Sequence, residues 1–145
     1  MKPSRDIPKF LDIVASLNKA GKLKTDAFLT PVSCCMISGG EYIGWGGAMG
    51  PAQFIPSTWA LYADKIEKIS GNPPANPWNI RDSFLANALY LKDLGAGSQK
   101  YAKELYAAGR YFGDPSSSYG KSVRKAADCM QGYIDNGSMS TDCQD

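Results

Sequence analysis

The sequence predicts a mainly α-helical protein of about five helices with a short glycine-rich hairpin or loop. Apolar residues recur every three or four positions over most of the chain, and Gly and Pro gather between these stretches. With 145 residues, 43% of them hydrophobic and 21% charged, the chain suits one compact domain with its own core. We expect this domain to comprise a basic helix and irregular segment (1–40), a glycine-rich loop (41–56), a helical core (57–136) and a tail (137–145).

The first helix is expected to begin at Asp6, as its N-cap, and to end at Gly21. Its predicted buried face is Ile7, Phe10, Val14 and Leu17. A second helix should start at Pro56, because proline is favoured in a first helical turn. Its predicted core residues are Trp59, Tyr62, Ile66 and Ile69.

Three further helices follow the proline-rich connection 71–78. Asn79 is a good N-cap for the third. Ser98 should open the fourth, and the fifth follows Asp114 and ends at Gly137. The apolar spacing predicts these buried stripes: Ile80, Phe84, Ala88 and Leu91 in the third helix; Tyr101, Leu105, Ala108 and Phe112 in the fourth; Tyr119, Val123, Ala126 and Met130 in the fifth.

Composition excludes several functions. A net charge of +2 is too small for a nucleic-acid-binding surface, so we expect no nucleic-acid partner. The chain has no histidine, which excludes Ser-His and Cys-His nucleophiles and histidine-dependent metal sites. We expect neither a metal nor a cofactor. Residues 1–24 hold six Lys and Arg, which favours an anionic polymer or is simply a solvated helix face.

The four cysteines have no C-x-x-C spacing, so they predict no zinc or redox motif. Cys34 and Cys35 are too close to bridge each other. Either this pair is bridged to Cys129 or Cys143, or Cys129 pairs with Cys143, and both schemes imply an oxidising compartment. The alternative is buried free thiols in a cytosolic protein.

The most informative segment is glycine-rich. Residues 39–53 contain six glycines and little helical periodicity, so the backbone there is expected to lie close to another group. Gln53 adds an amide that both donates and accepts hydrogen bonds. A bare backbone beside one amide suits an acetamido sugar, whose N–H and C=O need complementary partners. A structural turn is the competing interpretation.

Residues 47–57, GAMGPAQFIPS, resemble the G-A-M-G-x-x-Q-F-x-P-S segment of lytic murein transglycosylases, notably the membrane-bound B type. Weaker similarities follow at residues 76–80 (NPWNI), at 86–91 (ANALYL) and at 107–113 (AAGRYFG). In the last, Tyr111 stands at the position of the family's motif tyrosine, whereas Phe112 stands where Asn is usual. The resemblance spans about residues 44–125.

The resemblance implies a lysozyme-like fold and binding of peptidoglycan glycan strands. It also implies cleavage of the bond between N-acetylmuramic acid and N-acetylglucosamine without water, giving a 1,6-anhydro product. The family works without metal or cofactor. The residues that it marks as substrate-binding are Gly47, Ala48, Met49 and Gln53, with Tyr111 as the motif tyrosine. Trp45, which is flanked by glycines, is a further candidate because sugar faces stack on aromatic rings.

The family's catalytic glutamate ends a helix upstream of this motif. The glutamates here are Glu41, Glu67 and Glu104, and Glu41 lies inside the loop, six residues before Gly47. We expect the chain to start downstream of the catalytic glutamate, with Glu41 as the fallback. The expected protein is a monomer that acts outside the cytoplasm as part of a longer precursor. The alternatives are a non-catalytic wall-binding module and a lysozyme-type hydrolase that uses Glu41.

Overall fold

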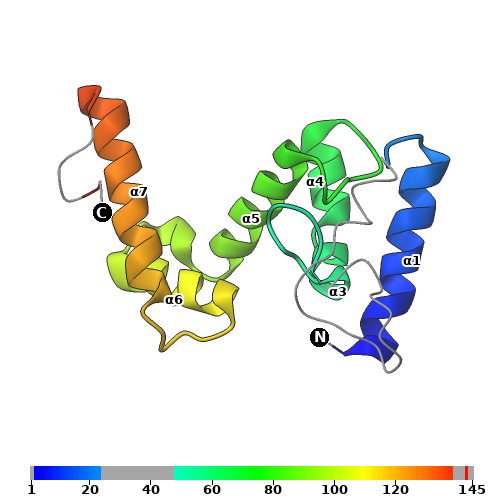
Figure 1. Ribbon diagram of the computed structural model, residues 1–145, viewed down its shortest axis with the longest axis horizontal. Coiled ribbons are helices and arrows are strands. Elements are labelled where there is room, and N and C mark those ends of the chain that lie inside the picture. Colours follow the sequence, from blue (N-terminus) through cyan, green and yellow to red (C-terminus); the bar gives the residue numbers. More distant parts are fainter. Residues whose placement is uncertain (1, 24–47, 139–142, 144–145) are drawn as a thin grey trace. The chain divides into compact units, whose positions relative to one another are not determined.

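The computed structural model describes residues 2–23, 48–138 and Cys143 (Figure 1). The chain divides into two compact units, Met1–Ala88 and Leu89–Asp145, and each is described by itself. Six α-helices and one 3₁₀-helix account for the regular structure of the described residues, so the predicted mainly-α fold is confirmed. None of these helices has the length and apolar character that a membrane-spanning helix requires.

Helix α1 (Pro3–Lys19) starts four residues earlier than predicted. Lys2 is its N-cap, so the prediction that Asp6 caps this helix was wrong. Pro3 can begin the helix because the first N–H groups of a helix have no partner within it. The predicted buried face is confirmed for Phe10, Val14 and Leu17, which are 9% exposed or less, whereas Ile7 is half-buried.

The predicted second helix is two helices, α3 (Pro56–Ala60) and α4 (Ala63–Ser70). Trp59, Tyr62 and Ile66 are buried as predicted, but Ile69 is 60% exposed and that prediction was wrong. Ser70, four residues after Ile66, is half-buried, so Ile69 lies beside the buried line of α4 rather than on it.

The connection between α4 and α5 is held by polar contacts. The Lys22 ammonium donates to the carbonyls of Asn72 and Pro73, both at 2.8 Å. Asn76 Nδ2 donates to the carbonyl of Lys22 at 3.2 Å, which completes a reciprocal contact. The proline-rich segment is thereby fixed against the end of α1.

Helix α5 (Ile80–Asp93) begins as predicted, because Asn79 Oδ1 accepts hydrogen bonds from the N–H groups of Arg81 and Asp82. Its predicted buried stripe was wrong: Ile80 and Phe84 are 54% and 67% exposed, Ala88 is exposed and Leu91 is half-buried. The buried residues are Asp82, Ser83 and Ala86. This face is buried because Asp82 Oδ2 accepts from the N–H of Asn76 and Ser83 Oγ donates to the carbonyl of Pro77.

The second unit contains the 3₁₀-helix η1 (Ala96–Ser98) and helices α6 (Tyr101–Phe112) and α7 (Tyr119–Asn136). Of the stripe predicted for α6, Ala108 is buried and Leu105 half-buried, while Tyr101 and Phe112 are 59% and 60% exposed. The stripe predicted for α7 was also wrong: Val123, Ala126 and Met130 are exposed and Tyr119 is half-buried.

Glycines explain why these stripes are not buried. A Cβ at Gly120 would lie 2.5 Å from the Leu105 carbonyl oxygen, and a Cβ at Gly109 would lie 2.7 Å from Cα of Pro115. Helix α7 therefore packs its backbone against α6 at Gly120, and the loop between the two helices packs against α6 at Gly109. The larger apolar residues on either side of these contacts are left at the surface.

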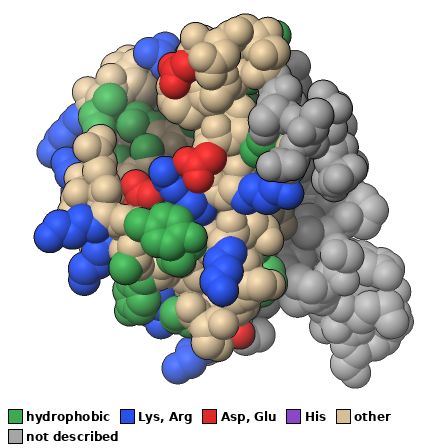
Figure 2. Space-filling view, turned by 90° about the vertical axis from the view of Figure 1, so that its left-hand side faces the viewer, with side chains coloured by type: hydrophobic (Ala, Val, Ile, Leu, Met, Phe, Trp, Pro, Cys, Tyr) green, Lys and Arg blue, Asp and Glu red, His purple; other side chains and the backbone are tan. Residues whose placement is uncertain are grey.

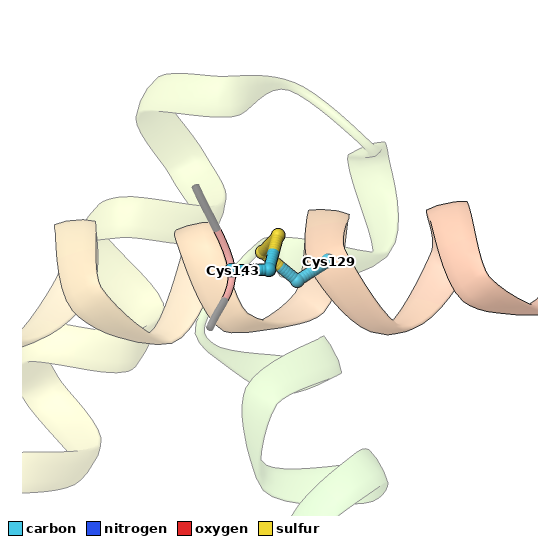
Figure 3. The surroundings of a disulfide bond; sticks show 2 residues. All are labelled: Cys129 and Cys143. Atoms are coloured by element: carbon cyan, nitrogen blue, oxygen red, sulfur yellow. A yellow bond between two sulfur atoms is a disulfide. The ribbon is translucent and has the colours of Figure 1, made fainter. Parts of the chain in front are cut away.

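A disulfide joins Cys129 of α7 to Cys143, with a Cα–Cα distance of 5.7 Å. Figure 3 shows the two sulfur atoms bonded to each other beside the helix. One of the two predicted pairing schemes is therefore present. Cys34 and Cys35 lie outside the described residues.

Candidate functional site

The first part of the sequence motif forms a tight turn before α3. The N–H of Met49 donates to the Phe54 carbonyl at 2.9 Å, and the N–H of Gln53 donates to the Gly50 carbonyl at 3.1 Å. Met49 and Phe54 are 1% and 4% exposed. Their side chains thus anchor both ends of the turn in the core, while Pro51 and Gln53 are exposed.

Gly50 is required by packing. Its φ is +61°, and a Cβ on it would lie 1.7 Å from the carbonyl oxygen of Pro77. The turn therefore lies directly against the backbone of the connection that precedes α5. At this position glycine is needed so that two backbone segments of the protein can pack together. This agrees with the alternative interpretation of the glycines as a structural turn. Gly44, Gly46 and Gly47 lie outside the described residues.

Gln53 is the exposed polar group of the turn. Its backbone φ is +54°, a left-handed conformation that costs a non-glycine residue about 1 kcal/mol. Its Nε2 donates to the Gly50 carbonyl at 2.8 Å, so the side chain is held across the turn. This hydrogen bond uses a donor of the amide and orients Oε1, which is an acceptor.

Aromatic packing fixes the segment that follows. The Phe54 ring contacts Trp59 edge-on at 6.2 Å and Tyr62 at 6.5 Å between centroids. Trp78 meets Phe10 edge-on at 6.4 Å. Trp59 is 1% exposed, so it is a core residue. The turn is consequently supported by a rigid aromatic cluster.

Asp6 ties α1 to the end of the motif. Its carboxylate is fully buried and accepts hydrogen bonds from the N–H of Ser57 at 3.0 Å, the N–H of Lys2 at 2.9 Å and the Arg5 guanidinium at 2.9 Å. Burial alone would raise the pKa of this carboxyl, but the hydrogen bonds from Ser57, Arg5 and Lys2 outweigh burial and hold the pKa well below its ordinary value. Asp6 is therefore an ionised structural group beneath the motif.

Tyr111 lies on α6 in the second unit, whereas Gln53 belongs to the first. Its ring is half-buried and packs against that of Tyr90, with centroids 6.1 Å apart. Burial raises the pKa of the Tyr111 hydroxyl, and the neighbouring Tyr119 and Tyr90 raise it further. The phenol stays protonated at neutral pH and is able to donate a hydrogen bond.

Two of the three glutamates have structural partners. Glu67 Oε1 accepts from the N–H of Ala75 at 3.0 Å, and Glu104 forms an ion pair with Arg124 at 3.2 Å. Glu41 lies outside the described residues, as do Trp45 and Gly47, and their roles stay predictions. Within residues 2–23, 48–138 and Cys143, no cluster of three or more His, Cys, Asp or Glu side chains is arranged to hold a metal ion.

The sequence motif indicated the turn, but it did not indicate the contacts that hold the turn in place. Asp6 accepts from a residue 51 positions away, and no local pattern indicates that partner. The contact between Gly50 and Pro77 is equally non-local.

No protein-family model, curated protein or solved structure matches this chain. The resemblance to transglycosylases therefore depends on the motif at residues 47–57 and the weaker similarities after it, and both the lysozyme-like arrangement and the enzymatic activity remain predictions.

Proposed function

We propose that this chain binds glycan strands of peptidoglycan through the turn 48–54, outside the cytoplasm. The observation that carries the proposal is Gln53, an exposed glutamine held in a left-handed conformation on a turn anchored by buried Met49 and Phe54. Backbone strain in an exposed residue is typical of sites that present a group to a ligand.

The chemistry of the turn suits an acetamido sugar. Gln53 Nε2 is engaged with the Gly50 carbonyl, which leaves Oε1 oriented to accept from the N–H of an acetamido group. Because the side chain is already held, binding costs little rotamer entropy. Pro51, exposed at the tip, restricts the backbone in the same way.

We also propose that the glycan strand is cleaved where a carboxylic acid lies beside this turn. The acid gives its proton to the glycosidic oxygen as the bond from C1 of N-acetylmuramic acid breaks. The C6 hydroxyl of the same sugar then attacks C1 and returns its proton to the carboxylate, which closes the 1,6-anhydro ring. Glu41 is the residue of this chain to test for that role.

The binding experiment is a titration of the ¹⁵N-labelled chain with chitotetraose, followed by amide chemical shifts. We expect the amides of Ala48, Gly50 and Gln53 to move, and Gln53→Ala to weaken binding about tenfold, as expected for one lost oriented hydrogen bond. Gln99→Ala is the matched control, because Gln99 is an exposed glutamine with a φ of +55° in the second unit. Unmoved amides in the turn, or equal losses in both variants, would refute the proposal.

The catalytic part has its own assay. Digestion of purified peptidoglycan, with products identified by mass spectrometry, separates the three possibilities: anhydro products indicate a transglycosylase, reducing ends a hydrolase, and intact polymer a binding module. Loss of either product in Glu41→Gln would identify Glu41 as the acid. Unchanged activity in that variant would exclude it.

A further inference from the structure

Two aromatic rings are stacked where α6 ends and α7 begins. Phe112 is the last residue of α6 and Tyr119 the first of α7, with ring centroids 4.6 Å apart and an interplanar angle of 13°. Phe112 is nevertheless 60% exposed. Because Tyr119 covers one face of the ring, this exposure belongs to the opposite face and the edge.

The loop between the two rings is rigid. The N–H groups of Gly113 and Asp114 both donate to the Gly109 carbonyl, at 3.0 and 2.9 Å. Gly109 lies so close to Pro115 that a Cβ could not be accommodated, and Gly120 is equally close to the backbone of Leu105. The ring pair is therefore held in place before any ligand arrives, which lowers the entropic cost of binding.

An ionised carboxylate lies in the same loop. Asp114 Oδ1 accepts from the N–H of Ser116 at 2.9 Å and from its hydroxyl at 2.6 Å. These bonds lower the pKa of the Asp114 carboxyl. Among the described residues no donor is bonded to Oδ2, and Asp114 is exposed. Oδ2 is thus open to accept hydrogen bonds from hydroxyl groups of a ligand.

One face of the molecule carries apolar and charged side chains together. Figure 2 shows hydrophobic side chains exposed among Lys and Arg side chains, with acidic groups adjacent to basic ones near the centre of that face. A single exposed aromatic residue is ordinary on a protein surface. A stacked pair at the ends of a hydrogen-bonded loop that also carries an exposed carboxylate is a more specific arrangement, because it combines a flat apolar ring with a polar group two residues further along the chain.

We propose that Phe112, backed by Tyr119 and bordered by Asp114, is a subsite for a neutral N-acetylhexosamine ring. The C–H face of a pyranose fits a flat aromatic surface, and its hydroxyls are donors for Oδ2 of Asp114. The carboxylate repels anionic ligands, so we expect sugars that carry a carboxylate, and the phosphates of nucleic acids, to bind less tightly than a neutral sugar. The inference rests on the proposed function, whose glycan supplies such rings, but concerns residues of the second unit alone.

The test uses the same chitotetraose titration, read at the amides of Gly113, Asp114 and Gly120. We expect these amides to move in the wild-type chain, and Phe112→Ala to weaken the affinity measured at them about tenfold. Phe112→Leu keeps an apolar side chain against Tyr119 without a ring and should be weakened as well. Phe84→Ala is the matched control, because Phe84 is 67% exposed on α5.

The outcomes separate this inference from the proposed function. If the amides of Ala48 and Gln53 move while those of Gly113 and Asp114 do not, the subsite is refuted and the proposed function stands. If only the second set moves and Phe112→Leu abolishes the effect, the subsite stands and the proposed role of the turn fails. The inference would be overturned if Phe84→Ala weakened binding as much as Phe112→Ala. It would also be overturned if muramyl dipeptide or a short oligonucleotide bound more tightly than chitotetraose at Gly113, or if no amide shifted at all.

Discussion

Replacing Asp6 with alanine removes the acceptor that joins α1 to the start of α3. Two backbone N–H groups, those of Lys2 and Ser57, lose their partner in a partly buried environment. An unsatisfied buried donor costs about 1–3 kcal/mol. We therefore expect Asp6→Ala to lower the free energy of unfolding by about 3 kcal/mol. Urea denaturation followed by tryptophan fluorescence measures this change, because Trp59 and Trp78 belong to the same unit as Asp6.

The matched control is Asp12→Ala, an exposed carboxylate on the same helix, which should change the free energy of unfolding by less than about 0.5 kcal/mol. Arg5→Ala should also have a small effect, because the Arg5 side chain is 47% exposed in its ion pair with Asp6. If Asp6→Ala cost no more than Asp12→Ala, the structural role assigned to Asp6 would be refuted.

The same carboxylate predicts a pH dependence with a definite sign. The pKa of Asp6 is lower in the folded chain than in the unfolded one, so the folded chain binds this proton less readily. The stability that Asp6 contributes is therefore fully present above its unfolded pKa of about 4, and is lost as the pH falls from there through the lower folded pKa. The stability difference between wild type and Asp6→Ala should shrink correspondingly in acid.

Two further predictions concern the backbone and the disulfide. Gly50→Ala should cost roughly 3 kcal/mol, because its Cβ would lie 1.7 Å from the Pro77 oxygen, whereas Gly71→Ala, with a φ of +65° and open space, should cost about 1 kcal/mol. Equal costs in urea denaturation would contradict the packing role of Gly50. Reduction of Cys129–Cys143, 14 residues apart, should destabilise the second unit by about 3 kcal/mol; an unchanged denaturation curve with dithiothreitol would contradict this.

Local signals in the sequence predicted several helix boundaries, but α1 begins before Asp6, and α6 begins at Tyr101 rather than at the predicted Ser98, which is the last residue of η1. Pro56 opens α3 and Asn79 caps α5 by hydrogen bonds within its own first turn. Gly71 and Gly137, both with positive φ, end α4 and α7. These features depend on residues a few positions apart, so a single sequence contains them.

The buried faces of α5 and α7 could not be predicted in this way. In α5 the polar residues Asp82 and Ser83 are buried because they satisfy backbone groups of another segment, and Phe84 is left exposed. In α7 the close contact with α6 is made by Gly120, and a search for regularly spaced apolar side chains does not detect a glycine. Large apolar residues are buried only where neighbouring helices or loops pack against them.

In the candidate site, too, local features could be predicted from the sequence and contacts between distant residues could not. The turn around Gln53 was predicted from its motif, whereas the reason for Gly50 became visible only through its contact with Pro77. The stacked pair Phe112 and Tyr119 was not predicted as a site, because both residues matched the spacing of buried stripes. In the structure Phe112 is exposed and Tyr119 is half-buried.

The most direct measurement is an intermolecular nuclear Overhauser effect between the acetyl methyl protons of bound chitotetraose and the side-chain amide protons of Gln53. Such a contact is expected if the turn holds the acetamido group. Saturating sugar that gives no effect at Gln53, or effects only at residues outside 48–54, would contradict the account.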